Sequence, residues 1–189
     1  IVGGETNTSF EINYLDIVRD VIKNVGYSKK EYKFDYKSCK ISNYIHSQSQ
    51  DINRGVDKKN KKEQGAGDQG MMFGYAINET ENFMPLALDL SHKLLEELSF
   101  IRKEYNKMKY LRPDSKSQVT VEYKNGVPFR INTIVLSTQH SEDLSLKDLR
   151  DIVKTHIIDA CLPKTLLDNK TKYFVIELSS FQLDYIDNF

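Results

Sequence analysis

The dipeptide Asn125-Gly126 is the feature that most restricts how this chain can fold. It separates two stretches, Gln118 to Tyr123 and Val127 to Leu136, whose residues are typical of strands. Asn-Gly adopts the positive φ angles of a two-residue hairpin turn at low cost, so the two stretches are expected to pair antiparallel. A fold for this chain therefore has to include an antiparallel sheet in its second half.

Apolar residues at helical spacing predict three helices around this hairpin. The first runs from Tyr14 to Val25, with Gly26 as its C-terminal cap, and the second runs from Pro85 to about Met108. The third follows Ser145, which begins a capping box. The apolar residues that define the three faces are Leu15, Val18, Ile22 and Val25; Leu90, Leu94, Leu98 and Ile101; and Leu149, Ile152, Val153 and Ile157.

Further strands are expected over Cys39 to Ile45, Met71 to Ile77 and Lys172 to Leu178, and residues 1–8 read as the end of a strand with a Gly-Gly turn. Residues 46–63 are polar and lysine-rich, which predicts a mobile loop or linker. The fold class is therefore α+β, with antiparallel or mixed sheets and helices packed on one face.

Composition excludes several classes of function. The 189 residues contain 27 Lys+Arg and 27 Asp+Glu, so no net field attracts nucleic acid or a membrane surface. The lysines at 58, 59, 61 and 62 have no interleaved aromatic residues and are interpreted as a solvated loop. No apolar run reaches the roughly 18 residues of a membrane helix. Cys39 and Cys161 form no metal motif or disulfide framework and are interpreted as buried thiols of a cytoplasmic protein.

The segment Gly65 to Gly70 reads G-x-G-x-x-G, the pattern of a dinucleotide-binding loop. That loop must follow a buried strand and open a helix, whereas here a lysine-rich run precedes it and Met71-Met72-Phe73 follows. A P-loop needs Gly-Lys-Ser/Thr, which is also absent from this segment. Two readings remain: a plain turn between sheets, or a backbone that approaches a ligand closely beside Asp68.

The sequence of this segment supports a backbone that approaches a ligand, because GAGDQGMMFGYA resembles the signature of the S-adenosylmethionine synthetase (methionine adenosyltransferase) family. Further segments resemble that family's motifs in the same order, and the resemblance covers residues 1–174. They are GGETNT at 3–8, SQSQDINRGVD at 47–57, NETENFMPLAL at 78–88, YLRPDSKSQVTVEY at 110–123 and VLSTQHSED at 135–143.

The resemblance implies an enzyme that makes S-adenosylmethionine, phosphate and diphosphate from ATP, L-methionine and water, with Mg²⁺ and K⁺. It implies that Glu5 and Gln48 bind methionine, and that the triplet Asp114-Ser115-Lys116 binds ATP. Gly67 and Asp68 are expected to line the active site. No catalytic residue or metal ligand is assigned, because the family's metal-binding segments have no counterpart here, and His140 is interpreted as structural. The competing readings are an exposed turn acid for Glu5 and a solvated lysine for Lys116.

The resemblance also predicts an organisation. Residues 1–47 correspond to part of the family's N-terminal domain, 48–63 to its mobile loop and 64–174 to its central domain. Residues 175–189, VIELSSFQLDYIDNF, instead resemble a Mur ligase that adds D-glutamate to UDP-N-acetylmuramoyl-L-alanine. We therefore expect a truncated chain of a homodimeric or homotetrameric enzyme, inactive alone. The alternative is a non-catalytic partner that keeps only the oligomer interface.

Overall fold

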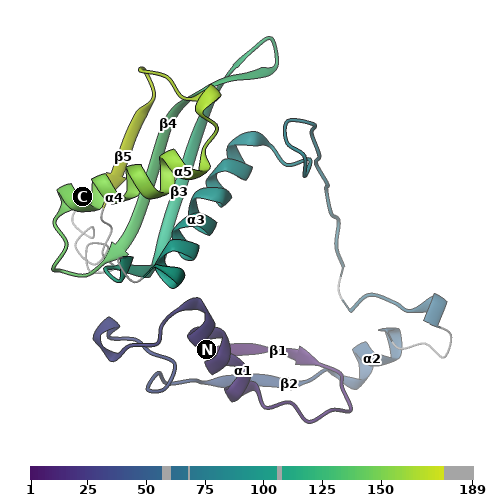
Figure 1. Ribbon diagram of the computed structural model, residues 1–189. Helices are drawn as coiled ribbons and strands as arrows, with labels where there is room; N and C mark the ends of the chain where they lie inside the picture. The colour runs from purple at the N-terminus through teal and green to yellow at the C-terminus, as the bar shows by residue number, and fades with distance from the viewer. Residues whose placement is uncertain (57–60, 68, 106–107, 177–189) are drawn as a thin grey trace, which may run out of the picture. The chain divides into compact units, whose positions relative to one another are not determined.

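The structure is a computed structural model, and it describes residues 1–56, 61–67, 69–105 and 108–176 (Figure 1). The chain divides into two compact units, Ile1–Gly74 and Tyr75–Phe189.

The first unit contains a two-stranded parallel sheet of β1 (Val2–Thr6) and β2 (Asn43–Ser47), joined through helix α1 (Tyr14–Val25). The predicted bounds of α1 are confirmed, and Gly26 caps it in the left-handed region with φ 119°. The predicted Gly-Gly turn is wrong, because both glycines lie within β1 and pair with β2. The strand expected over 39–45 lies at 43–47, since residues before it form turns around a buried carboxylate.

That buried carboxylate belongs to Asp35, which is 4% exposed and organises the connection between α1 and β2. Its Oδ1 accepts the N–H groups of Lys37 and Ser38 at 2.8 and 3.1 Å. The Ser38 hydroxyl also donates to Asp35, and this hydrogen bond lowers the pKa of the carboxyl group. Arg19 of α1 donates to the carbonyls of Lys37 and Cys39 at 3.0 and 3.4 Å. These polar contacts hold α1 against the segment that leads into β2.

The polar stretch predicted as a loop is partly helical. Helix α2 spans Gln50–Val56, and the Ser49 hydroxyl accepts the N–H of Ile52 at 3.3 Å, which supports its first turn. A 3₁₀ turn follows over Lys61–Glu63. The strand predicted over residues 71–77 is wrong: these residues form no ladder, and Met72 and Phe73 are 93% and 88% exposed. Strand-like composition is not sufficient here, because the described residues provide no partner strand.

The second unit is built on a three-stranded mixed sheet in the order β3-β4-β5 (Figure 1). Strands β3 (Leu111–Lys124) and β4 (Val127–His140) are antiparallel, and β5 (Lys172–Ile176) runs parallel to β4. The predicted hairpin is confirmed, with Asn125 at φ 51° and Gly126 at φ 77°. Both strands are longer than predicted, and β3 starts before the Asp114 triplet.

Helices cover one face of this sheet, as the fold class predicts (Figure 1). They are α3 (Leu86–Glu104), α4 (Leu146–Val153) and α5 (Asp159–Cys161), with a π-helical turn over Lys154–Ile158 before α5 and a 3₁₀ turn over Lys164–Leu166 after it. Together with the sheet they bury one core. Its members are Leu86, Leu90, Leu94, Leu98, Ile101, Met108, Leu111, Val119, Ile131, Ile134, Leu136, Leu149, Val153, Ile157, Ile158, Leu162 and Val175.

The caps of the second unit match the sequence in part. Ser145 accepts the N–H of Asp148 at 3.1 Å, so the predicted capping residue of α4 is confirmed. Helix α3 ends at Glu104, four residues earlier than predicted. Cys39 and Cys161, which were expected to be buried thiols, are both free and only partly buried.

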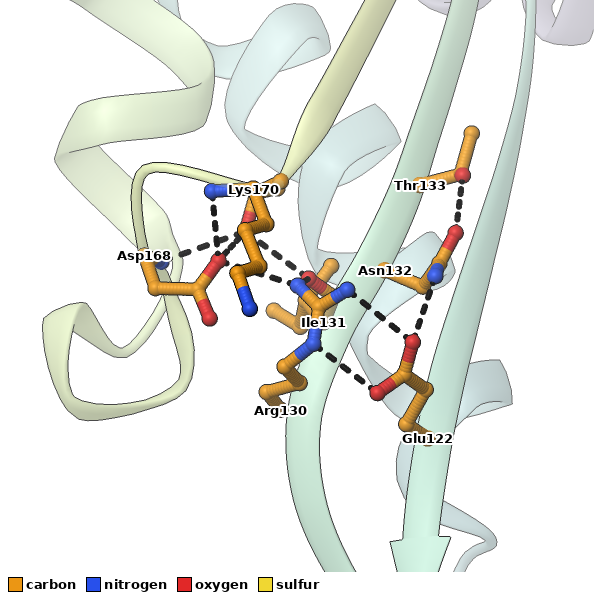
Figure 2. A network of polar contacts seen from close by, with 8 residues as sticks. Glu122, Arg130, Ile131, Asn132, Thr133, Asp168 and Lys170 are labelled. Atoms are coloured by element: carbon orange, nitrogen blue, oxygen red, sulfur yellow. Dashed lines mark hydrogen bonds and ion pairs between the residues drawn. The ribbon is translucent and has the colours of Figure 1, made fainter.

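An ion-pair network links strands near the β3–β4 turn, at the opposite end of β3 from Leu111 (Figure 2). Arg130 of β4 forms two parallel bonds to Glu122 of β3, both 2.9 Å, and a third of 2.9 Å to Asp168, which precedes β5. Asn132 donates to the same Glu122 carboxylate at 2.6 Å. Arg130 and then Asn132 lower the pKa of Glu122. One guanidinium group therefore connects the segments of all three strands.

Candidate functional site

Glu5 lies on β1 directly opposite His46 of β2 in the parallel register. Its Oε1 is 3.4 Å from His46 Nε2, and the side chains are 43% and 65% exposed. The second ring nitrogen of His46 lies 3.2 Å from the Tyr44 carbonyl oxygen. Glu5 is thus held on a strand and is not a turn residue, and its carboxylate is open to solvent. Such a group can bind a ligand ammonium by a charge-assisted hydrogen bond.

Gln48 is the first residue after β2, and its backbone N–H donates to the carbonyl of Thr6 at 3.0 Å. This bond continues the β1–β2 pairing by one residue, so Gln48 sits at the end of the same sheet as Glu5. Its side chain lines a hollow of ≈ 290 Å³. The other lining residues are Thr6, Asn7, Thr8, Phe10, Ile12, Tyr14, Ile45, His46 and Ser47.

Gly67 lies close to the side chain of Gln48. A Cβ atom built at Gly67 would be 3.2 Å from Gln48 Nε2. Two of the residues singled out from sequence are therefore neighbours in the first unit. Asp68, the third residue expected there, lies outside the described residues.

The triplet Asp114-Ser115-Lys116 lies within β3, where Ser115 is opposite Thr138 and Lys116 is opposite Ser137. Along the strand, Asp114 and Lys116 are exposed, while Ser115 is partly buried. The Ser117 hydroxyl, one residue on, donates to a carbonyl of helix α3. Because side chains alternate along a strand, Lys116 leaves the sheet on the face opposite that helix. Its ammonium group is therefore available to an anionic ligand.

Each unit carries its own part of the predicted site: Glu5, Gln48 and Gly67 in the first and the triplet in the second. Within the described residues, no group of three or more His, Cys, Asp or Glu side chains is arranged to hold a metal ion. None of the helices in the described part of the chain is long and apolar enough to cross a membrane.

Two features of the structure were not found from sequence. His46 escaped notice because its relation to Glu5 depends on the parallel register of two strands whose paired residues are 41 positions apart in the sequence. The second is a hollow of ≈ 430 Å³ in the second unit, beside the start of α3. There Asp89, 5% exposed, forms an ion pair of 2.7 Å with Lys93 and accepts a hydrogen bond of 2.8 Å from the Asn82 amide. Burial acts to raise the pKa of Asp89, but contacts with Lys93 and Asn82 and the charges of Lys93 and His92 together lower it below its ordinary value.

His140 is 9% exposed, and its Nδ1 lies 2.7 Å from the carbonyl oxygen of Ser141. It ends β4, on the strand that forms the centre of the sheet. This buried position, with a backbone partner, agrees with the structural interpretation of the residue.

Comparison with known proteins gives matches over most of the chain. Residues 63–181 match the family model described as "S-adenosylmethionine synthetase, central domain", and residues 1–50 match "S-adenosylmethionine synthetase, N-terminal domain". The chain is 51% identical over 170 residues to an S-adenosylmethionine synthase of Flavobacterium johnsoniae, covering 89% of this chain and 41% of that protein. It is 58% identical over 151 residues to one of Parabacteroides distasonis, covering 79% of this chain and 35% of that protein.

A third relative, from Cytophaga hutchinsonii, is 50% identical over 182 residues and covers 91% of this chain. The chain spans about two fifths of the length of these relatives, between 35% and 43%. The central-domain match alone includes more than half of the chain, and the N-terminal match includes Glu5 on β1 and Gln48 directly after β2. The chain therefore belongs to the S-adenosylmethionine synthetase family.

Proposed function

We propose that this chain is part of a methionine adenosyltransferase, which forms S-adenosylmethionine, phosphate and diphosphate from ATP, L-methionine and water. The observation that carries the proposal is the match to two consecutive domains of the family, with Glu5 and Gln48 at the end of one sheet. In this reaction the methionine sulfur attacks the ribose C5′ carbon and the polyphosphate leaves. A thioether carries no proton to remove, so binding and orientation of the two substrates provide much of the rate.

In the first unit, we assign methionine binding to Glu5 and Gln48. The exposed Glu5 carboxylate pairs with the substrate ammonium, in competition with His46 Nε2 at 3.4 Å. Gln48, next to Gly67, offers an amide that can both donate to and accept from the substrate. Gly67 and Asp68 are proposed to line the same site, and 48–63 is proposed to close over the substrates.

In the second unit, we assign ATP binding to Asp114, Ser115 and Lys116. Lys116 leaves the uncovered face of the sheet as a compact positive charge, which favours contact with the departing polyphosphate. The strand fixes its backbone through pairing with Ser137, so little reorganisation is needed when charge develops on the leaving group. Asp114, two residues away, is exposed in the same unit.

Mg²⁺ and K⁺ are the ions proposed for the complete enzyme, where they would neutralise the polyphosphate. The described residues include no group of three or more His, Cys, Asp or Glu side chains arranged to hold a metal ion. We therefore assign no metal ligand to this chain and derive no step through a metal.

We propose that the complete enzyme works as a homodimer or homotetramer, and that this chain alone does not turn over. An alternative is that the chain is a non-catalytic partner that retains only the oligomer interface. Large side chains that stay exposed favour association with other protein surface; they include Met71, Met72, Phe73 and Tyr75. Size measurement with and without a full-length synthetase separates self-association from partnership.

The test uses the purified chain with L-methionine and with ATP, read by NMR chemical shifts, together with a turnover assay containing Mg²⁺ and K⁺. Glu5→Gln should abolish the methionine-induced shifts, and Lys116→Ala should abolish the ATP-induced shifts. Glu11→Gln and Lys172→Ala are the matched controls, since both residues are exposed and Lys172 lies on the same sheet. Binding that survives both site substitutions would overturn the assignments, and turnover by the wild-type chain would refute its inactivity.

The domain bounds 1–47, 48–63 and 64–174 and the tail 175–189 are also part of the proposal. We propose that the tail derives from a sequence like the Mur ligase that adds D-glutamate, because it reads VIELSSFQL from Val175. The family match continues to residue 181, and residues 177–189 lie outside the described part of the chain. Sequencing the encoding locus in independent clones tests this origin: an uninterrupted synthetase reading frame across residue 174 in every clone would refute it.

A further inference from the structure

Residues 65–67 lie next to two segments that precede them in the sequence, Gln48 and the end of α2. The chain leaves β2 at Gln48, forms α2, and comes back along residues 65–67. At this return the N–H of Gly65 donates to the carbonyl of Val56 at 3.0 Å. That carbonyl belongs to the last residue of α2 and has no partner within the helix, so Gly65 supplies the missing donor.

The approach at Gly65 leaves no room for a side chain. A Cβ built on Gly65 would be 2.6 Å from the carbonyl oxygen of Gly55, and this oxygen belongs to the backbone of α2. Gly65 is not among the glycines at positive φ, which are Gly4, Gly26 and Gly126. The requirement for glycine at 65 is therefore one of space, and does not come from an unusual backbone conformation.

At Gly67 the missing side chain is replaced by Gln48. A Cβ there would lie 3.2 Å from Gln48 Nε2 and 3.9 Å from Val56 Cγ2. Gly67 also has no positive φ. The Gln48 amide thus fills the space that a side chain at 67 would occupy, while α2 closes the other side.

We propose that Gly65 and Gly67 are positioning residues for Gln48: together they let the returning chain pack on the last turn of α2 and on the Gln48 amide. The proposal rests on the proposed function in that Gln48 is taken as a methionine ligand. Gly65 determines the position of α2. Gly67 determines the orientation of the Gln48 side-chain amide, which precedes α2 in the sequence. A methyl group at 65 displaces backbone, whereas a methyl group at 67 displaces mainly the Gln48 side chain.

The experiment compares Gly65→Ala and Gly67→Ala with Gly74→Ala, whose added Cβ meets nothing within 4 Å. The readouts are the side-chain NH₂ resonances of Gln48, hydrogen exchange of the α2 amides, and methionine-induced shifts. Gly65→Ala should speed α2 exchange by about tenfold or more. Gly67→Ala should move the Gln48 NH₂ resonances and weaken methionine binding about fivefold, with smaller changes in α2 exchange. Gly74→Ala should leave all three unchanged.

A double-mutant cycle tests whether the effect of Gly67 acts through Gln48. In a Gln48→Ala background, Gly67→Ala should weaken methionine binding no further. If wild type binds no methionine, the proposed function of this chain fails, and the Gln48 resonances and α2 exchange still decide the positioning role. Gly65→Ala and Gly67→Ala chains that match Gly74→Ala in both of these readouts would overturn the proposal. Resonances of the paired strands β1 and β2 report whether the first unit of a variant remains folded.

Discussion

Glu79 stabilises the start of helix α3 from outside the helix, and its removal gives a sharp prediction. Pro85 occupies the N-cap position of α3 and forms no side-chain cap. Glu79 Oε2 instead accepts the N–H of Leu86, the first residue of the helix, at 2.9 Å. The same oxygen accepts the hydroxyl of Tyr123 on β3 at 3.0 Å. One partly buried carboxylate therefore links the helix to the sheet.

The expected cost of Glu79→Ala follows from these two contacts. Loss of a side-chain acceptor at a helix N-terminus costs about 1 kcal/mol, and loss of a negative charge there adds about 0.3–1 kcal/mol. Since Glu79 is only partly buried, water replaces part of the lost hydrogen bonding to Tyr123. We expect the free energy of unfolding to fall by about 1–2 kcal/mol and Tm to fall by roughly 2–8 °C. Glu79→Gln keeps an acceptor and should cost about half as much.

Urea denaturation followed by circular dichroism measures the stability change, with Glu81→Ala as the control for an exposed acid in the same turn. A second readout is the ionisation of Tyr123, found as the difference between wild-type and Tyr123→Phe absorbance titrations. Burial and then the Glu79 carboxylate raise the pKa of Tyr123, so Glu79→Gln should lower this pKa while burial keeps it above its ordinary value. A Glu79→Ala chain as stable as Glu81→Ala, with an unchanged Tyr123 titration, would refute this account.

Three further predictions concern the core and its titrating groups. Leu94→Ala, at a fully buried position, should lower the free energy of unfolding by about 2–5 kcal/mol in the same denaturation assay. Burial and then Glu97 raise the pKa of Cys161 to about 11, so iodoacetamide at pH 8 should modify it slowly until urea unfolds the chain. The pKa of Asp89 is lower in the folded chain than in the unfolded chain. The ionised carboxylate therefore stabilises the fold at pH values above the unfolded-state pKa, and this stabilisation is lost as the pH falls through the folded-state pKa. Asp89→Asn should therefore lose less stability than wild type on acidification below about pH 4.

Local signals were sufficient where a residue's own chemistry decides the structure. The Asn125-Gly126 turn, the left-handed Gly26 cap and the Ser145 cap all appear where the sequence places them. In each case the preference lies within a few bonds of the residue itself. The helical face of α3 was also predictable, because three leucines and one isoleucine (Leu90, Leu94, Leu98 and Ile101) recur at the spacing of one helix face.

The sequence was not sufficient to predict features that depend on contacts between residues far apart in the chain. Met71 to Ile77 has the composition of a strand, yet a strand exists only where a second strand satisfies its backbone. The short helix α2 was missed since its stability comes from contacts at its ends, Ser49 at one and Gly65 at the other. His46 became visible beside Glu5 only once the parallel register was known. The identity of the methionine and ATP residues came from family resemblance, and their roles stay predictions.

The position of Lys116 shows how the core and the proposed site depend on each other. On β3 its neighbour Ser117 faces the helices and donates to the carbonyl of Ser91 on α3 at 2.7 Å. Val119, two residues further on the same face, is buried in the core. Since side chains alternate along a strand, these contacts with the covered face require Lys116 to emerge on the other face. A shift of one residue in the register of β3 would bury the lysine and expose Ser117 and Val119, at the cost of the core packing. The hydrophobic pattern on the covered face of β3 thus determines that the proposed polyphosphate contact, Lys116, lies on the opposite face of the same strand.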